Sequence, residues 1–348
     1  MRWVLDHFEI LGRHGQNRVS DGSRAAKTIV SDTGWNNHSH TIGTGQMSFT
    51  IAHLSDPHLG PLPIPKLNEW TTKRIMGFVN WKRRRQRLND MAVLGHLVAD
   101  LRAQLPDHIA MTGDAINIGL PAEFGPAAAW MRTLGPSDKV SFTPGNHDAY
   151  VRGAIPMLMS AFAPWIRSDD DADRTPPFPF LRVRGDIALV GLCSGIPTGP
   201  LMATGRLGSV QLERLDTLLE ELRERDLARV IMIHHPPLTS SAGSMRSLTD
   251  AREFERIVRL RGAELVLHGH NHKRLVRFLM SARSQNVGGR IPVIGVQSAS
   301  STSPDLRLRA AYNLVRLKRN GRQWSISVRS RGLTRGSQQI SEREAVLS

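Results

Sequence analysis

The chain has few of the residues that mark disulfide-rich, thiolate-ligated or membrane-spanning proteins. Its 348 residues include one cysteine, Cys193, which leaves no internal disulfide partner and no thiolate cluster for a closed structural zinc site. No apolar run approaches the roughly 18 residues of a membrane span. The short apolar runs near the N-terminus are broken by charged residues, unlike a secretory signal. We therefore expect a cytoplasmic protein without disulfides.

Acidic residues are also scarce relative to basic ones. Lys and Arg number 46 against 31 Asp and Glu, a formal net charge of +15. Such an excess favours anionic partners, including phosphate esters, nucleic acid and acidic lipid. A generally basic proteome would explain the same excess equally well.

The chain divides by composition into three parts. Residues 1–46 are polar and show no sustained apolar period, so they are interpreted as a disordered leader or an over-extended start, with Met47 the expected functional beginning. A single domain is expected over 47–334 and a flexible tail over 335–348.

Strand-like and helix-like patterns alternate through most of that domain. Apolar strand-like runs lie at 48–55, 108–113, 139–144, 187–193, 229–234 and 263–268, and helical patterns at 88–105, 122–134, 210–225 and 251–261. Further strand-like runs follow at 291–297, 311–318 and 323–330. The order predicts an α/β sandwich with helices covering the sheets.

Polar side chains follow five of these strand-like runs. They are Asp56-Pro-His58, Gly113-Asp114, Gly145-Asn146-His147-Asp148, His234-His235 and His268-Gly-His270-Asn-His272. Each motif alone could be turn chemistry or a packed ring. Because ligands bind beyond the carboxyl ends of strands in α/β sheets, the five together predict one site.

The residue types indicate metal ions. Carboxylate, imidazole and amide ligands without thiolate suit Mn, Fe, Zn or Co. Seven or eight ligands exceed the needs of one ion and fit two divalent ions, which a carboxylate such as Asp114 can bridge at about 3.5–4 Å separation. Such a pair lowers the pKa of a bridging water and clamps phosphoryl oxygens for in-line attack.

The five motifs, in this order, resemble those of the calcineurin-like metallophosphoesterase family, from about residue 50 to about residue 272. The resemblance implies a four-layer αββα sandwich with a di-metal site at the carboxyl ends of the strands. It implies that Asp56, His58 and His272 hold one ion, that Asn146, His234 and His270 hold the other, and that Asp114 bridges them. His234 is favoured over His235 because it fits the family's His-x-Pro pattern.

Other residues near the motifs receive supporting roles. The resemblance implies that His147 gives a hydrogen bond or proton to the substrate, and Asp148 is expected to orient the His147 ring. Asn117 stands where the family often has an acidic residue. His53 and His268 are expected to pack or to support ligands.

A basic segment over residues 72–87 separates the first two motifs. Its cations are Lys73, Arg74, Lys82, Arg83, Arg84, Arg85 and Arg87, interleaved with Phe78 and Trp81. One interpretation is an anionic surface contact, either nucleic acid or an acidic membrane to which the protein associates peripherally. The other is a solvated helix with Phe78 and Trp81 in the core.

Three functions are compatible with these features. The motifs resemble those of class III cyclic-nucleotide phosphodiesterases and their glycerophosphodiesterase relatives, which implies a phosphodiesterase using a metal-bridging hydroxide with His147 assisting the leaving group. The alternative is a hydrolase of a lipid-linked or nucleic-acid phosphodiester or pyrophosphate recruited by the basic segment; the lipid A pathway pyrophosphatases typically have Arg in place of His147. The third is a non-catalytic scaffold, disfavoured because no ligand is missing.

Overall fold

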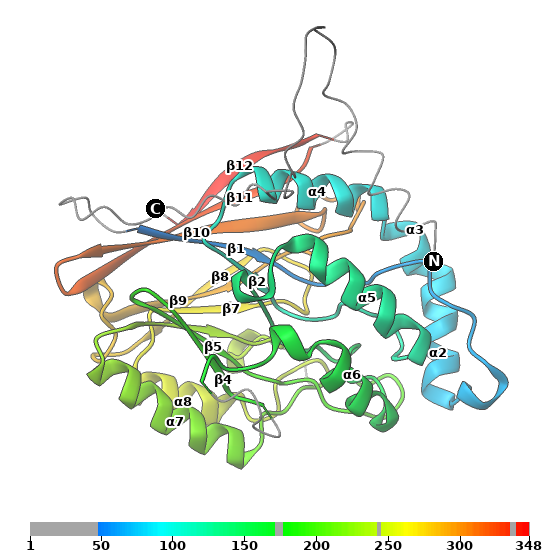
Figure 1. Cartoon of the computed structure of the whole chain (residues 1–348), viewed down its shortest axis with the longest axis horizontal. Coiled ribbons are helices and arrows are strands. Elements are labelled where there is room, and N and C mark those ends of the chain that lie inside the picture. Colours follow the sequence, from blue (N-terminus) through cyan, green and yellow to red (C-terminus); the bar gives the residue numbers. More distant parts are fainter. Residues whose placement is uncertain (1–47, 171–176, 242–244, 335–338, 348) are drawn as a thin grey trace, which may run out of the picture. The chain divides into compact units, whose positions relative to one another are not determined.

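The computed structural model describes residues 48–170, 177–241, 245–334 and 339–347, which form two six-stranded sheets (Figure 1). The first sheet has the order β12 (Ile340–Leu347), β11 (Gln323–Leu333), β10 (Ala311–Asn320), β1 (Ser48–Leu54), β2 (His108–Met111) and β3 (Val140–Phe142). The second has the order β4 (Phe180–Arg184), β5 (Ile187–Gly191), β6 (Ala228–Met232), β7 (Leu265–His268), β9 (Arg290–Gly295) and β8 (Leu275–Met280). Strands β1 to β3 run parallel, as do β5, β6, β7 and β9, so their carboxyl ends share an edge within each sheet.

Helices connect the parallel strands. They are α2 (Thr72–Asn80), the π-helical turn η3 (Trp81–Arg85), α3 (Gln86–Leu88), α4 (Met91–Ala103), α5 (Pro121–Leu134), α6 (Ile155–Ala161), α7 (Ser209–Glu224) and α8 (Ala251–Arg261). Short 3-10 turns lie at Leu67–Glu69, Ser137–Lys139, Arg152–Ala154, Ala163–Trp165, Thr239–Ser241 and Val287–Gly289. Helices α4 and α5 lie on one face of the first sheet because both belong to crossovers that step the same way, from β1 to β2 and from β2 to β3.

Two apolar layers hold the sheets and helices together. Between the sheets, Ile51 and Val315 of the first pack in one buried cluster with Leu189 and Val230 of the second. On the other side of the second sheet, the leucine stripe of α7 packs with α8 against the strands; its members are Leu212, Leu215, Leu219 and Leu222. The expected αββα sandwich is therefore confirmed.

Among the expected helices, the largest difference in boundaries is at the first. The helix expected from Leu88 begins at Met91, because the Asp90 side chain accepts a hydrogen bond from the Ala92 amide at 2.7 Å and caps the helix there. The segment before it forms the separate stretch α2–η3–α3.

Three edge strands, β4, β8 and β12, were not expected from the sequence. The flexible tail proposed from residue 335 is wrong for Ile340–Leu347, which pair with β11 as β12. That segment has three consecutive charged residues, Glu342, Arg343 and Glu344, in its middle and lacks the alternation of a half-buried strand, so its place depends on backbone hydrogen bonds to a neighbour. The expected leader, residues 1–46, lies outside the described residues and stays a prediction. Among the described residues, no helix has the length and apolar character needed to cross a bilayer.

Candidate metal centre

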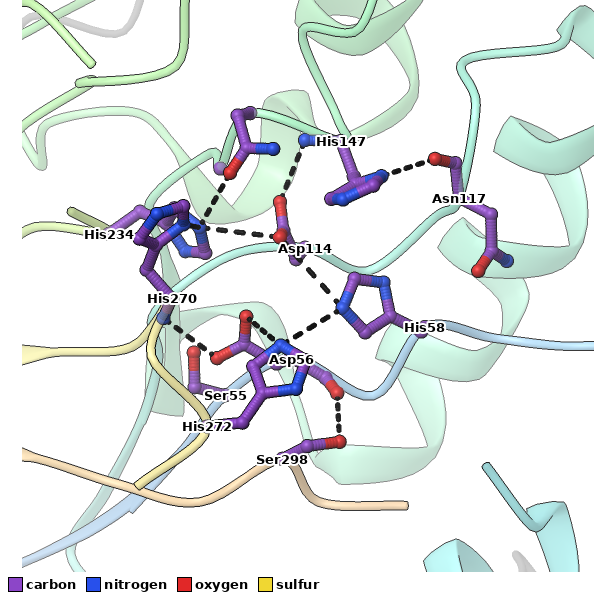
Figure 2. Close-up of polar contacts among 12 residues, drawn as sticks. Ser55, Asp56, His58, Asp114, Asn117, His147, His234, His270, His272 and Ser298 are labelled. Atoms are coloured by element: carbon purple, nitrogen blue, oxygen red, sulfur yellow. Dashed lines mark hydrogen bonds and ion pairs between the residues drawn. The ribbon is translucent and has the colours of Figure 1, made fainter. Parts of the chain in front are cut away.

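The carboxyl ends of five strands deliver the predicted ligands to one place. Asp56 and His58 follow β1, Asp114 follows β2, Asn146 follows β3, His234 follows β6, and His270 and His272 follow β7. Figure 2 shows Asp56 and the four ligand histidines pointing toward one another around Asp114, with His147 beside them. The structure thus brings together all seven expected ligands.

The backbone is strained where it carries these ligands. Non-glycine residues rarely adopt positive φ, and such strain clusters at functional sites. Eight do so in the described part of the chain, and five of them are expected ligands: Asp56 (53°), His58 (43°), Asp114 (55°), His270 (69°) and His272 (50°). The surrounding structure therefore imposes these side-chain directions against local preference.

One ligand group contains Asp56, His58 and His272. The Nε2 atom of His272 lies 3.2 Å from Oδ1 of Asp56 and 3.3 Å from Nε2 of His58. Two nitrogens bound to one ion at 2.0–2.1 Å would be about 3.0–3.4 Å apart. Oδ1 of Asp56 is buried and has no hydrogen-bond partner, as expected of a metal ligand.

A second group contains Asn146, His234 and His270. Nε2 of His234 lies 3.3 Å from Oδ1 of Asn146 and 3.3 Å from Nδ1 of His270. Nδ1 of His234 faces the Thr112 carbonyl oxygen at 2.6 Å, so this nitrogen carries the proton and donates. Nε2 thereby faces the other ligands, as in known metal-binding histidines. Although burial opposes it, Asp114 raises the His234 pKa to about 9 and so favours a proton on this nitrogen, which a bound ion would displace.

The neighbouring ring of His235 is held differently. Its Nδ1 lies 2.8 Å from the Ser194 hydroxyl and its ring packs 4.5 Å from that of His270. His235 also belongs to a possible ligand group with His234 and His270, but it is His234 that forms the ion pair with the Asp114 carboxylate. The contacts therefore favour His234 as the ligand of the pair. His53 and His268 are buried and hydrogen-bond to a threonine hydroxyl and a backbone carbonyl respectively.

Asp114 lies between the two groups. Its Oδ2 is 3.3 Å from Nε2 of His234 and 3.9 Å from Nε2 of His58, while Oδ1 accepts the backbone amide of His147 at 2.8 Å. Burial opposes ionisation of Asp114, but the His234 and His147 rings outweigh it and hold its pKa well below the usual value. Asp114 is thus an anionic carboxylate in the position of a bridge.

Two glycines allow the loops to approach this closely. Gly113 has φ of +97°, and a Cβ there would lie 2.5 Å from Nδ1 of His234. A Cβ on Gly145 would overlap the carboxylate of Asp114. The glycines in both motifs are therefore required by packing around the ligands.

The donor set fits two divalent metal ions. The structure places Asp56 with His58 and His272, and Asp56 with Asp114 and His234, in groups whose ligand atoms lie within 4.8 Å of one another. Buried carboxylate and imidazole donors without thiolate suit open, water-accessible centres rather than a closed structural zinc site.

His147 lies beside this cluster with both ring nitrogens engaged. Nδ1 faces the Asn117 carbonyl oxygen and therefore carries a proton, while Nε2 lies 2.8 Å from Nη2 of Arg85 and accepts from it. The ring stacks on Tyr150 with centroids 5.5 Å apart. Burial first, and the Arg85 guanidinium second, lower the pKa of His147 to about 3. The ring is neutral in this arrangement.

Asp148 does not orient the His147 ring, contrary to the sequence expectation. Its carboxylate accepts backbone amides from Asp114 (2.7 Å), Gly145 (2.8 Å) and Ile116 (3.2 Å). These bonds join the loops after β2 and β3, so Asp148 positions the ligand-bearing backbone. The Asn117 carbonyl fixes His147 instead.

The loop after β9 also supports the centre, which the sequence did not indicate. The Ser298 hydroxyl donates to the Asp56 carbonyl oxygen at 2.6 Å, and the Ser300 hydroxyl donates to that of Pro57 at 2.7 Å (Figure 2 shows the first). Both hydroxyls brace the strained turn between Asp56 and His58. Serines in a loop carry no sequence signal that distinguishes this role.

The basic segment is not one surface, because three of its cations point inward. Lys73 and Arg74 are buried and donate to backbone carbonyl groups of the loops around Ile118 and Tyr150. Arg85 reaches His147 and belongs to the site. The expectation of an anionic-surface contact is therefore wrong for these three, and the exposed cations of residues 72–87 are Lys82, Arg83, Arg84 and Arg87.

Arg85 is the site residue that sequence reasoning misplaced. Trp81, four residues earlier, is buried against Ile118 and Tyr150, and residues four apart share a helix face. The four-residue spacing of Trp81 and Arg85 was the feature of the sequence that could have indicated this position. It predicts an inward Arg85 only once Trp81 is known to be buried.

Comparison with known proteins shows the family and agrees with the fold. The model of the calcineurin-like phosphoesterase family matches residues 49–274, and the chain belongs to this family. A probable cyclic nucleotide phosphodiesterase of Synechococcus sp. is 27% identical over 241 residues, covering 66% of this chain and 76% of the relative.

A solved structure with a TM-score above 0.5 shows a similar fold. A purple acid phosphatase from yellow lupin seeds has a TM-score of 0.53 at 10% identity, covering 86% of this chain and 53% of its own. A dimetal phosphatase from Danio rerio has a TM-score of 0.49 at 14% identity, covering 84% and 98%. At these identities the likeness concerns the fold.

Proposed function

We propose that the chain is a metal-dependent phosphodiesterase that hydrolyses small phosphodiesters. The observation that carries the proposal is the position of Asp114, whose Oδ2 lies between Nε2 of His234 and Nε2 of His58. The name of the Synechococcus relative supports diesters, and cyclic nucleotides are the first substrates to test.

The residues around Asp114 would hold the two ions in two groups. The first ion would be held by Asp56, His58 and His272. The second would be held by Asn146, His234 and His270. Asp114 would bind both ions. When bound, such ions supply hydroxide near neutral pH and neutralise charge on phosphoryl oxygens. Oδ1 of Asp56, which is buried and accepts no hydrogen bond, and Nε2 of His234, which faces Asn146 and His270, support this assignment.

Arg85 would bind a phosphoryl oxygen of the substrate. Its guanidinium lies at the cluster, with Nη1 3.3 Å from Nδ1 of His58 and Nη2 2.8 Å from Nε2 of His147. Arg donates charge-assisted hydrogen bonds to phosphate in a fixed, planar geometry. An incoming phosphate would therefore take over N–H groups that now point to a neutral ring.

His147 would then assist departure of the ester oxygen. The negative charge of a bound phosphate favours protonation of the ring, and Nδ1 stays bonded to the Asn117 carbonyl. The new proton on Nε2 would pass to the leaving oxygen as the phosphorus–oxygen bond breaks, and water would restore it. The scaffold alternative has no comparable support, since no ligand is displaced.

A substrate panel tests the proposal. The Mn-loaded full chain is assayed on cyclic nucleotides, a bis-aryl phosphate, a glycerophosphodiester, phosphomonoesters and single-stranded DNA, with Asp114→Ala prepared identically to reveal contaminating enzymes. We expect the largest kcat/KM on a small diester and none above background for the variant. Turnover of monoesters alone, or equal rates in the variant preparation, would refute a phosphodiesterase.

A further inference from the structure

The outer side of residues 64–87 exposes apolar side chains that the fold leaves uncovered. Leu67 is 95% exposed, Ile64 82%, Ile75 48% and Val79 40%. Single exposed apolar residues are ordinary, but four within sixteen positions are a patch that marks an interaction site.

Five exposed cations accompany these apolar side chains. They are Lys66, Lys82, Arg83, Arg84 and Arg87, and no ion pair is recorded for any of them within the described ranges. Ile75, Val79 and Arg83 follow one another at four-residue spacing, so apolar and basic residues continue along one side of the α2–η3 helix. We call these nine exposed side chains the basic-apolar face.

The inner side of the same segment is firmly held. Phe78 and Trp81 pack against Leu120 and Tyr150, and Arg74 donates to the Glu69 carbonyl oxygen at 3.1 Å, which ties the loop before α2 to the helix. Figure 1 shows this segment as the blue loop and the cyan helix α2. The segment is therefore fixed in place by its inner contacts, and these contacts do not involve the exposed apolar side chains.

We propose that the basic-apolar face docks the protein on an acidic phospholipid surface. Cations attract anionic headgroups, while neighbouring apolar side chains enter the boundary between headgroups and acyl chains. A nucleic-acid groove would instead need free aromatic rings for base stacking. Trp81 is buried, and Trp70 packs edge-on against Phe78 with centroids 5.3 Å apart, so the rings of this segment are engaged with one another and the core.

Docking would place the metal centre beside the membrane. Arg85 belongs to the same π-helical turn as Lys82, Arg83 and Arg84 but points the opposite way, to His147. The outer side of this turn contacts lipid and its inner side contacts the site. Binding to lipid does not depend on the proposed hydrolysis, so either idea can fail alone.

Vesicle flotation of the full chain tests the proposal. Phosphatidylcholine vesicles with and without phosphatidylglycerol are compared at low and high salt. We expect binding only to the acidic vesicles, weakened by salt. The variant Arg83→Ser/Arg84→Ser/Arg87→Ser should bind roughly 10- to 100-fold more weakly, because each cation contributes about fivefold at most.

Two further variants make the test specific. A control of equal charge change, Arg225→Ser/Arg252→Ser/Arg322→Ser, should bind like the parent. It removes three exposed cations, from the C-cap of α7, from α8 and from the turn between β10 and β11. Ile64→Ser/Leu67→Ser should bind roughly tenfold more weakly and keep the parent's melting temperature, because both side chains are exposed.

The outcomes separate the alternatives. No binding to acidic vesicles, or an equal loss in the control, overturns the proposal. Two results together would identify a nucleic-acid surface instead. The Ile64→Ser/Leu67→Ser variant would bind single-stranded DNA tightly and no more weakly than the parent, and it would bind acidic vesicles like the parent.

Discussion

The five ligand loops and the basic segment both gather charged side chains, but they direct them differently. Each ligand loop is a short turn at a strand end, and its side chains converge on Asp114. The basic segment is a helix, and its cations diverge: Lys73 and Arg74 enter the core, Arg85 enters the site, and Arg84 faces solvent. A cluster of like residues in a sequence therefore has one role only where the backbone gives its members one direction.

The largest effect should come from the convergent loops. Asp114→Ala removes the atom between both ligand groups, so hydrolysis should fall by at least about 1,000-fold. Metal content, measured by mass spectrometry on the same sample, should drop from two ions to one or none. If the variant keeps both ions and near-normal rates, Asp114 does not bridge the ions.

His147→Ala separates a proton donor from a ligand within those loops. Alkyl or nucleoside diesters, whose leaving oxygen needs a proton, should slow by about 100- to 10,000-fold. Activated aryl diesters should slow much less, and metal content should stay the same.

His270→Ala is the matched control for His147→Ala. It should slow both kinds of ester and lower metal occupancy. If His147→Ala slows both esters equally or loses metal, its role as proton donor is wrong.

Arg85 and Arg84 provide a matched pair within the basic segment. Arg85→Ala should lower kcat/KM by about 10- to 100-fold, the cost of one or two charge-assisted hydrogen bonds to phosphate. Arg84→Ala, next in sequence but exposed, should stay within about twofold. Arg85→Lys should recover part of the loss, and equal effects at the two positions would mean that only net charge matters.

Asp148 should affect stability more than chemistry. Asp148→Ala leaves three buried backbone amides without their acceptor, so the free energy of unfolding should fall by about 2–4 kcal/mol in urea denaturation. Asp107→Ala, at an exposed carboxylate that accepts one amide, should cost less than about 1 kcal/mol. A selective loss on alkyl diesters with unchanged stability would instead support a direct role for Asp148 beside His147.

The sequence alone determined the fold class and predicted which residues are the candidate metal ligands. Parallel strands of one sheet end at a common edge, so Asp56 and Asp114 had to meet once the strands were recognised, and the packing of the second sheet against the first brings His234 to them. The glycines before Asp114 and Asn146 belong to the same local motifs. Local pattern sufficed because strand direction fixes where the next residue lies.

Only the tertiary structure decided the direction of helical and supporting side chains. Arg85 faces the site because Trp81 is buried, and Asp148 binds amides because the loops after β2 and β3 lie side by side. Ile340–Leu347 form β12 because β11 offers a free edge. Each of these outcomes depends on a partner distant in sequence, and composition and spacing along one segment contain no information about that partner.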